Sequence, residues 1–346
     1  MSQFKINSIT DKTGTSGPVI AGVSTNNSTG CMIIPAGPTE HRGGRGRGVV
    51  AGGRDASNPH VSTMDLIEIA TTGNATDFGN LSDGGRDYPA GCGSPTRGIF
   101  FAGAEPGFRT VIDYVVMSSS GGANDFGDMR IAPIQNTALS NATRGITAGG
   151  LTAPTPSYTK NKSIEFIVMA STGDSSGFGD LTEDNAASST CASPTRGIFN
   201  QGSVPTYKKT IEYITIATGG NATRFGDSTK AGAGGPAGAS SVTRGVFAGG
   251  QHDNPYPLSD IIDYITIATE GNAIDFGDLA AATVQASGLS NSIRGLFAGG
   301  SSPNKTNVIS FVTIASTGNA TDFGDLTVAR DRLNQGAADA HGGIGR

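Results

Sequence analysis

One sequence unit recurs six times between about residue 46 and the end of the chain, and it constrains the fold more than any other feature. Each copy opens with Arg-Gly followed by apolar and small residues, as in RGVFAGG, and closes on Phe-Gly. The opening arginines are Arg47, Arg97, Arg144, Arg196, Arg244 and Arg294, and the closing phenylalanines are Phe78, Phe126, Phe178, Phe225, Phe276 and Phe323. Successive closing phenylalanines lie 48, 52, 47, 51 and 47 residues apart. A period of about 50 residues is typical of four-stranded propeller blades and not of helical solenoids.

Four strands are expected in each copy. The segment RGVFAGG predicts a short apolar strand that ends at Gly-Gly, and IDYITIAT (262–269) predicts a central strand rich in β-branched and aromatic residues. A turn of the type TGNAT follows, in which Gly and Asn tolerate positive φ. The segment DFGDLT and a stretch of small residues before the next Arg-Gly supply the remaining strands. The fold is therefore predicted to be all-β.

The two ends of the repeat region predict a closed ring. Eighteen residues beyond Phe323 the chain reads His341-Gly342, where another Arg-Gly would stand. The tail LTVARDRLNQGAADAHGG thus resembles the strand that precedes an Arg-Gly, and the first copy lacks such a strand before Arg47. Pairing the tail with the first copy would hide the sheet edges that an open array exposes. We expect residues 46–346 to form a six-bladed β-propeller closed by the C-terminal strand.

Repeated positions are expected to build the frame. We predict that each closing Phe fills the space between adjacent blades, and that the repeated arginines are structural. An acidic residue precedes the Phe by thirteen positions in five copies, at Asp65, Asp113, Glu165, Glu212 and Asp263. A carboxylate at one position of five blades is a frame element rather than a catalytic group, and the repeated Arg is its expected counter-charge. Cys92 and Cys191 each lie five residues before an Arg-Gly and are predicted to be small buried fillers, not disulfide or metal ligands.

Length variation concentrates in one loop per copy. Between the Gly-Gly and the acidic position the interval varies from nine to fourteen residues, whereas the other intervals are nearly constant. These loops span about 54–64, 104–112, 151–164, 203–211, 251–262 and 301–309. Their aromatic and basic side chains can stack on sugar faces or anchor a protein contact, or they can simply pack their own loops. The candidate binding residues are His60, Phe108, Tyr158, Tyr207, Lys208, His252, Tyr256 and Lys305.

Several classes of partner and chemistry find no support. The net charge of −5, with no basic cluster beyond HRGGRGR, argues against nucleic acid. No secretory signal opens the chain, and no apolar run is long enough to span a membrane. The four histidines lack metal-ligand spacing. Asp77-Phe78-Gly79 and GGRGRGVVAGG match kinase and dinucleotide motifs without the surrounding elements that those sites need. We expect neither a metal nor another cofactor.

Residues 1–45 lie outside the repeat and are expected to form an arm. They contain two predicted strands, PVIAGVST (18–25) and CMIIPAG (31–37), separated by the polar turn NNSTG. Two strands alone are marginally stable in water. The arm is therefore expected to dock on the propeller, on a second copy of the chain to give a homo-oligomer, or on another protein.

The repeats resemble two groups of proteins. The Gly-Gly after the second strand and the acidic-aromatic pairs Glu212-Tyr213 and Asp263-Tyr264 resemble kelch propellers, although Phe replaces the usual Trp of the fourth strand. More specifically, TRGVFAGG, TGNATDFGDLT, the preamble GTSGPVIAGVSTNNSTG and the ending DAHGG are similar to structural proteins of tailed phages that infect marine cyanobacteria and similar hosts.

The phage resemblance implies a non-enzymatic virion protein, assembled in the host cytoplasm. It would be a component of a tail fibre, baseplate or surface appendage that binds host surface glycan or protein through its variable loops. The arm at 1–45 would attach it to other virion proteins. Two alternatives remain at this stage: a capsid decoration or cement protein that binds only virion partners, and a polysaccharide-degrading enzyme. The enzyme would need two carboxylates unique to one loop cluster, and no such pair stands out.

Overall fold

A computed structural model of the chain describes residues 46–152, 158–200, 202, 208–252 and 257–344, together with two short strands nearer the N-terminus. The chain divides into two compact units, Met1–Glu40 and His41–Arg346, close to the predicted boundary at residue 45. In the first unit, β1 (Ser24–Thr25) pairs antiparallel with β2 (Met32–Ile33). Both strands lie within the segments predicted from the sequence. What the arm docks on stays a prediction.

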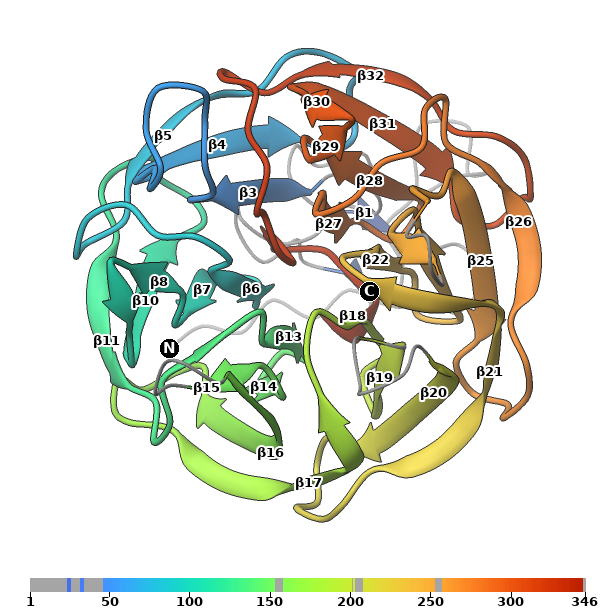
Figure 1. The fold of residues 1–346 in the computed structure, drawn as a ribbon, viewed down its shortest axis with the longest axis horizontal. Coiled ribbons are helices and arrows are strands. Elements are labelled where there is room, and N and C mark those ends of the chain that lie inside the picture. The colour runs from blue at the N-terminus through green and yellow to red at the C-terminus, as the bar shows by residue number, and fades with distance from the viewer. Residues whose placement is uncertain are drawn as a thin grey trace, which may run out of the picture. The chain divides into compact units, whose positions relative to one another are not determined.

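The second unit is a six-bladed β-propeller, as predicted, and Figure 1 shows its sheets arranged radially around one axis. From the axis outward, blade 1 contains β33 (Ala337–Ala338), β3 (Arg47–Ala51), β4 (Thr63–Glu68) and β5 (Thr76–Asn80). Blade 2 contains β6 (Ala90–Gly93), β7 (Arg97–Phe101), β10 (Val111–Val116) and β11 (Asn124–Asp128). Blade 3 contains β13 (Thr137–Ser140), β14 (Arg144–Ala148), β16 (Thr159–Val168) and β17 (Ser176–Asn185). Blade 4 contains β18 (Ser189–Ala192), β19 (Arg196–Asn200), β20 (Lys208–Thr215) and β21 (Thr223–Gly234). Blade 5 contains β22 (Ala237–Ser240), β23 (Arg244–Ala248), β25 (Ile261–Thr266) and β26 (Ile274–Asp278). Blade 6 contains β27 (Ser287–Ser290), β28 (Arg294–Ala298), β31 (Val308–Thr313) and β32 (Thr321–Asp325).

Further short strands lie between the strands of the blades. They are β8 (Ala104–Glu105), β9 (Gly107–Phe108), β12 (Pro133–Ile134), β15 (Leu151–Thr152), β24 (Gln251–His252), β29 (Ser301–Ser302) and β30 (Asn304–Lys305). A single 3-10 turn, η1 (Gly342–Ile344), ends the described part of the chain, which contains no α-helix.

The strand registers define two faces of the ring. In blade 2, Arg97 pairs with Val116 at one end of the sheet, and Phe101 pairs with Ile112 at the other. The turns that join first to second and third to fourth strands therefore lie on one face, which we call the turn face. The variable loops between second and third strands lie on the opposite face, the mouth face. The crossover segments, which link each outer strand to the inner strand of the next blade, reach the axis on the mouth face too.

The C-terminal strand closes the ring, as predicted. Ala337 and Ala338 of β33 pair antiparallel with Val49 and Gly48 of β3. Antiparallel pairing gives the innermost edge of blade 1 the ladder hydrogen bonds that it would otherwise lack.

Three consecutive residues just before β33 add ion pairs to this closure. Arg330 lies 3.0 Å from the Asp65 carboxylate, and both side chains are fully buried. Asp331 accepts from Arg54 at 3.4 Å, and Arg332 donates to Asp87 at 2.6 Å. Because Asp65 and Arg54 belong to blade 1 and Asp87 leads into blade 2, the tail is held to two blades.

The closing phenylalanines lie between blades, which confirms their predicted role. All six are buried, with exposed fractions between 2% and 6%. Phe323 of blade 6 packs in one cluster with Ile67 and Ile69 of blade 1. In five blades the Phe also meets an aromatic ring of the third strand edge to face, as Phe276 does with Tyr264 at 5.9 Å between centroids. Such geometry suits the ring quadrupoles.

The TGNAT segments join neighbouring blades, in addition to turning the chain. Gly271 donates its backbone N–H to the Phe225 carbonyl at 3.0 Å, and the Asn272 side chain accepts from the backbone of Asp227. A Cβ on Gly226 would lie 2.0 Å from the Gly271 carbonyl oxygen. The same hydrogen bond, from the turn glycine to the carbonyl of the closing Phe, recurs at every interface of the ring. The close approach explains why glycine follows each closing Phe.

The predicted ion pairs between repeated Arg and repeated acid are wrong. Arg97 instead donates to the Met169 carbonyl of the next blade at 3.0 Å, and its guanidinium lies 4.9 Å from the centre of the Tyr114 ring. The reason is the register: Arg97 is at the turn end of β7, whereas Asp113 pairs with Phe100 near the mouth end.

The repeated acids bind the preceding crossover segment instead. Asp65, for example, accepts from the Thr327 hydroxyl at 2.7 Å and from its backbone N–H at 3.0 Å. In two blades the acid also pairs with a buried Arg that is not repeated, as Asp113 does with Arg86 and Asp65 with Arg330.

The two described cysteines are buried and free, as predicted. Burial raises the pKa of Cys92 to about 12 and also raises the pKa of Cys191. Both are therefore unreactive thiols at neutral pH.

Candidate ligand-binding site

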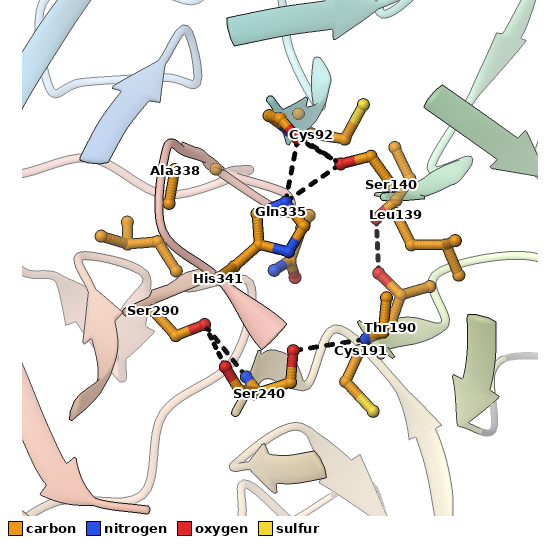
Figure 2. A pocket seen from close by; sticks show the side chains of 16 residues that line it. Cys92, Leu139, Ser140, Thr190, Cys191, Ser240, Ser290, Gln335, Ala338 and His341 are labelled. Atoms are coloured by element: carbon orange, nitrogen blue, oxygen red, sulfur yellow. Dashed lines mark hydrogen bonds between the residues drawn. The ribbon is translucent and has the colours of Figure 1, made fainter. Parts of the chain in front are cut away.

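The central channel is closed on the turn face by the C-terminal segment. Figure 2 shows His341 at the centre of the ring of inner strands, where its Nε2 lies 2.9 Å from the Gly93 carbonyl oxygen and 3.1 Å from the Ser140 hydroxyl. Beyond it, η1 leaves no space for a Cβ on Gly343, which would lie 1.9 Å from the Ser140 carbonyl oxygen. The cavity that remains around His341 measures about 30 Å³, room for little more than water. This end of the channel is a packed plug.

The mouth face holds a larger pocket on the same axis, with a volume of about 210 Å³. The crossover segments supply most of its wall, and the loop after β23 adds Gln251. Its polar lining residues are Tyr88, Gln135, Ser188, Gln251, Gln285 and Asn334. Asn334 also donates to the Asn136 carbonyl, and the adjacent Gln335 donates to the Gly238 carbonyl at 2.8 Å. The tail that closes the ring thus also lines the pocket.

Four side chains of the pocket project from a left-handed backbone conformation. Tyr88, Gln135 and Ala187 have φ of 56°, Gln285 has φ of 59°, and in blade 5 the equivalent residue is Gly235 with φ of 71°. Non-glycine residues held in this region cost about 1–3 kcal/mol each and cluster at functional sites.

Backbone hydrogen bonds between neighbouring crossover segments hold this conformation in place. Ala187 donates to Gln135, Gly235 to Ala187, and Gln285 to Gly235, at 2.8 to 2.9 Å. The rigid frame therefore holds Tyr88, Gln135, Ala187 and Gln285 at equivalent positions around the pocket.

A hydrogen bond across the mouth fixes Tyr88. The Gln285 amide donates to the Tyr88 hydroxyl at 2.8 Å, although the two residues are 197 positions apart. Burial raises the pKa of Tyr88, so the phenol is neutral at physiological pH. The guanidinium of Arg332 lies 5.8 Å from the centre of the Tyr88 ring. The ring is thus a fixed part of the wall.

Charged side chains gather beside the pocket and neutralise one another. Asp87 accepts from Arg332 and lies 3.5 Å from Nδ1 of His60, while Asp331 pairs with Arg54 and lies 3.9 Å from Lys305. Burial raises the pKa of Asp87, and its basic neighbours oppose that rise. Among the described residues, no charged side chain lines the pocket itself.

The structure brings some of the predicted binding residues together, but none of the described ones lines the pocket. His60 and Lys305 belong to the charged cluster beside it. Phe108 and Tyr158 stack with ring centroids 5.9 Å apart and an interplanar angle of 12°, which joins the variable loops of blades 2 and 3. Tyr158 is 56% exposed.

The remaining candidates are placed only by their backbones or not at all. Lys208 and His252 both pair with Gly232, from opposite sides of β21. Tyr207 and Tyr256 lie outside the described residues.

The variable loops that were predicted to bind lie on the same face as the pocket, but the prediction did not include the residues that line the pocket. The pocket residues Tyr88, Gln135, Ala187, Gly235 and Gln285 each stand nine positions before an Arg-Gly. At that fixed position the residue type changes from copy to copy, and this variation in type was the available signal. Variation in loop length pointed to the neighbouring loops instead.

In the described part of the chain, no three His, Cys, Asp or Glu side chains are grouped so that they could ligate a metal ion. The same part of the chain forms no helix with the length and hydrophobicity that a membrane crossing requires.

Comparison with known proteins places the chain among β-propellers. No protein-family model matches the sequence, and a search of curated proteins finds no match. A solved structure titled "Structure of YjhT" superposes with a TM-score of 0.59 at 13% sequence identity, covering 75% of this chain and 91% of that chain. At this identity the likeness concerns the fold alone. The protein is a six-bladed β-propeller with an axial pocket on its mouth face and a plugged channel on its turn face.

Proposed function

We propose that this protein is a non-enzymatic structural component of a phage virion, in a tail fibre, baseplate or surface appendage, which binds host surface glycan or protein through its mouth face. The observation that carries the binding role is the axial pocket, which shares one face with the variable loops, whereas the tail closes the channel at the other face. The virion assignment is supported by the resemblance of the repeats to phage structural proteins.

The point at which the chain enters the ring suits this role. Gly46, the first described residue of the ring, lies on the turn face, where an added Cβ would be 3.1 Å from Asn291 and from Ala340. Gly46 therefore lies on the face that lacks the pocket. In the proposed role, residues 1–45 attach the protein to other virion proteins and the mouth face binds the host.

The pocket chemistry favours binding over hydrolysis. Glycoside hydrolysis needs two carboxyl groups that flank the scissile bond. The described lining residues include no carboxylate, and the nearby Asp87 and Asp331 are engaged by Arg332 and Arg54.

Incubation of the purified full-length protein with cell-envelope material from a cyanobacterial host tests the proposal. We expect the protein to sediment with the envelope and to release no soluble oligosaccharide. Release of oligosaccharide would identify a polysaccharide-degrading enzyme. Failure to sediment with any host envelope, combined with binding to virions that lack the protein, would identify a decoration or cement protein.

A further inference from the structure

We infer that the axial pocket on the mouth face binds one neutral sugar ring, such as the terminal monosaccharide of a host surface glycan. This inference rests on the proposed function, because it names the ligand class for the same face.

The size of the pocket supports a ligand of one ring. Its volume of about 210 Å³ is below the range of about 300–1,000 Å³ that is usual for drug-sized ligands. The packed plug around His341 closes the channel below it, so a polymer cannot thread through the ring. The pocket therefore suits the end of a glycan chain and not an internal segment.

The lining chemistry supports a neutral ligand rich in hydroxyl groups. Gln135, Gln251, Gln285 and Asn334 are amides, each of which can donate and accept hydrogen bonds, as sugar hydroxyls do. The charged side chains next to the pocket are already paired with each other, so a charged ligand would find no free counter-ion in the described wall. The Tyr88 ring adds an apolar surface of the kind that packs against sugar C–H groups.

The backbone conformation is an independent indication of a site. Tyr88, Gln135 and Gln285 occupy the left-handed region although glycine occurs at the equivalent position of blade 5. Glycine would avoid the conformational cost, so the larger side chains at these positions need another reason. Presentation of an aromatic ring and two amides to one ligand is such a reason.

Binding of free monosaccharides to the full-length protein, measured by calorimetry or ligand-observed NMR, tests the inference. The probes are glucose, galactose, mannose and N-acetylglucosamine, with glucuronic acid and glucosamine as charged counterparts. We expect saturable binding of at least one neutral sugar with a dissociation constant of about 1 mM, which is typical for so small a ligand. The charged counterparts should bind at least about tenfold more weakly.

Two variants locate the binding in the pocket. Ala187→Tyr fills it with the residue that blade 2 carries at the same φ, so the backbone should accept the change. Gln285→Ala removes the amide that holds Tyr88. Each variant should weaken sugar binding at least about tenfold. Val242→Thr, at an exposed position of a turn-face loop, is the control and should bind like the unmodified protein.

The outcomes separate this inference from the proposed function. No saturable binding of any neutral sugar below about 10 mM, or equal binding by Ala187→Tyr, overturns the sugar pocket. If the protein then still sediments with host envelope, and Tyr158→Ala weakens that retention, the proposed function survives through the variable loops. Sugar binding without any envelope retention supports the pocket and contradicts the host-binding role.

Discussion

The repeated residues of this propeller act mainly across the interfaces between blades. Arg97 illustrates the pattern, because it stacks on Tyr114 of its own blade and donates to the Met169 carbonyl of the next. The last repeated arginine, Arg294, donates to the Ile69 carbonyl of blade 1 and so completes the circle. Both arginines make a cation–π contact within their own blade and a hydrogen bond to the backbone of the next blade. The repeated acids do not pair with these arginines and bind the crossover segments instead.

At the residue scale we predict a large loss of stability for Phe276→Ala. The Phe is 2% exposed and lies between blades 5 and 6, so its removal leaves a cavity that the strands cannot easily fill. The free energy of unfolding should fall by about 3–5 kcal/mol, measured by denaturant titration. Ile274→Ala on the same strand, where the side chain is 58% exposed, should change it by less than about 1 kcal/mol. Equal effects of the two changes would contradict the interface role.

Asp65→Asn tests the buried ion pair with Arg330. Both side chains are fully buried, so the change leaves an uncompensated guanidinium and should cost about 3–5 kcal/mol of unfolding free energy. The exposed pair of Arg109 with Asp83 provides the comparison, and Asp83→Asn should cost less than about 1 kcal/mol. Thermal and denaturant unfolding of both variants gives the answer, and similar losses would refute the distinction by burial.

At the scale of an element, the C-terminal tail performs three tasks. Its strand β33 completes blade 1, Arg330 to Arg332 form ion pairs with blades 1 and 2, and His341 with η1 plugs the channel. These contacts explain why the tail contains charged residues immediately before a strand of small ones. Small residues fit the narrow centre of the ring, and charged residues reach outward.

Asp339 gives this tail a pH dependence. Burial raises the pKa of its carboxyl group from the ordinary 3.8 to about 6, although the Arg47 backbone N–H donates to it. The folded state therefore favours the protonated acid, whose contribution to stability is complete below about pH 4 and is lost as the pH rises through 6.

Between these two pH values the unfolding free energy should fall by up to about 2–3 kcal/mol from this group. Asp339→Asn keeps an acceptor oxygen and removes the titration. The difference between the unmodified protein and Asp339→Asn, measured by denaturant unfolding at several pH values, should show that fall. A difference that is constant with pH would contradict the prediction.

At the scale of the whole molecule, stability depends on closing the ring. Six equivalent interfaces exist only if blade 6 meets blade 1, and Phe323 packs against Ile67 at that last interface. An open array would expose the edge of β3, and exposed strand edges promote aggregation.

Deletion of residues 328–346 should therefore yield aggregated protein. The shorter deletion of residues 341–346 keeps β33 and the ion pairs of Arg330 to Arg332, so it should stay soluble and folded with a lower melting temperature. Size-exclusion chromatography and circular dichroism distinguish the two results. A soluble, folded product of the longer deletion would show that ring closure is dispensable.

The sequence by itself determined the number of blades, the strand order, the burial of the closing Phe and the origin of the closing strand. These features follow from spacing and residue type, which a repeat displays six times. Only the tertiary structure decided which carbonyl each Arg meets and which side chains share the pocket. Tyr88 and Gln285, 197 residues apart, become neighbours because every crossover segment returns to one axis. The local sequence determines the fold of each blade, whereas the arrangement of six blades around one axis determines which residues line the pocket.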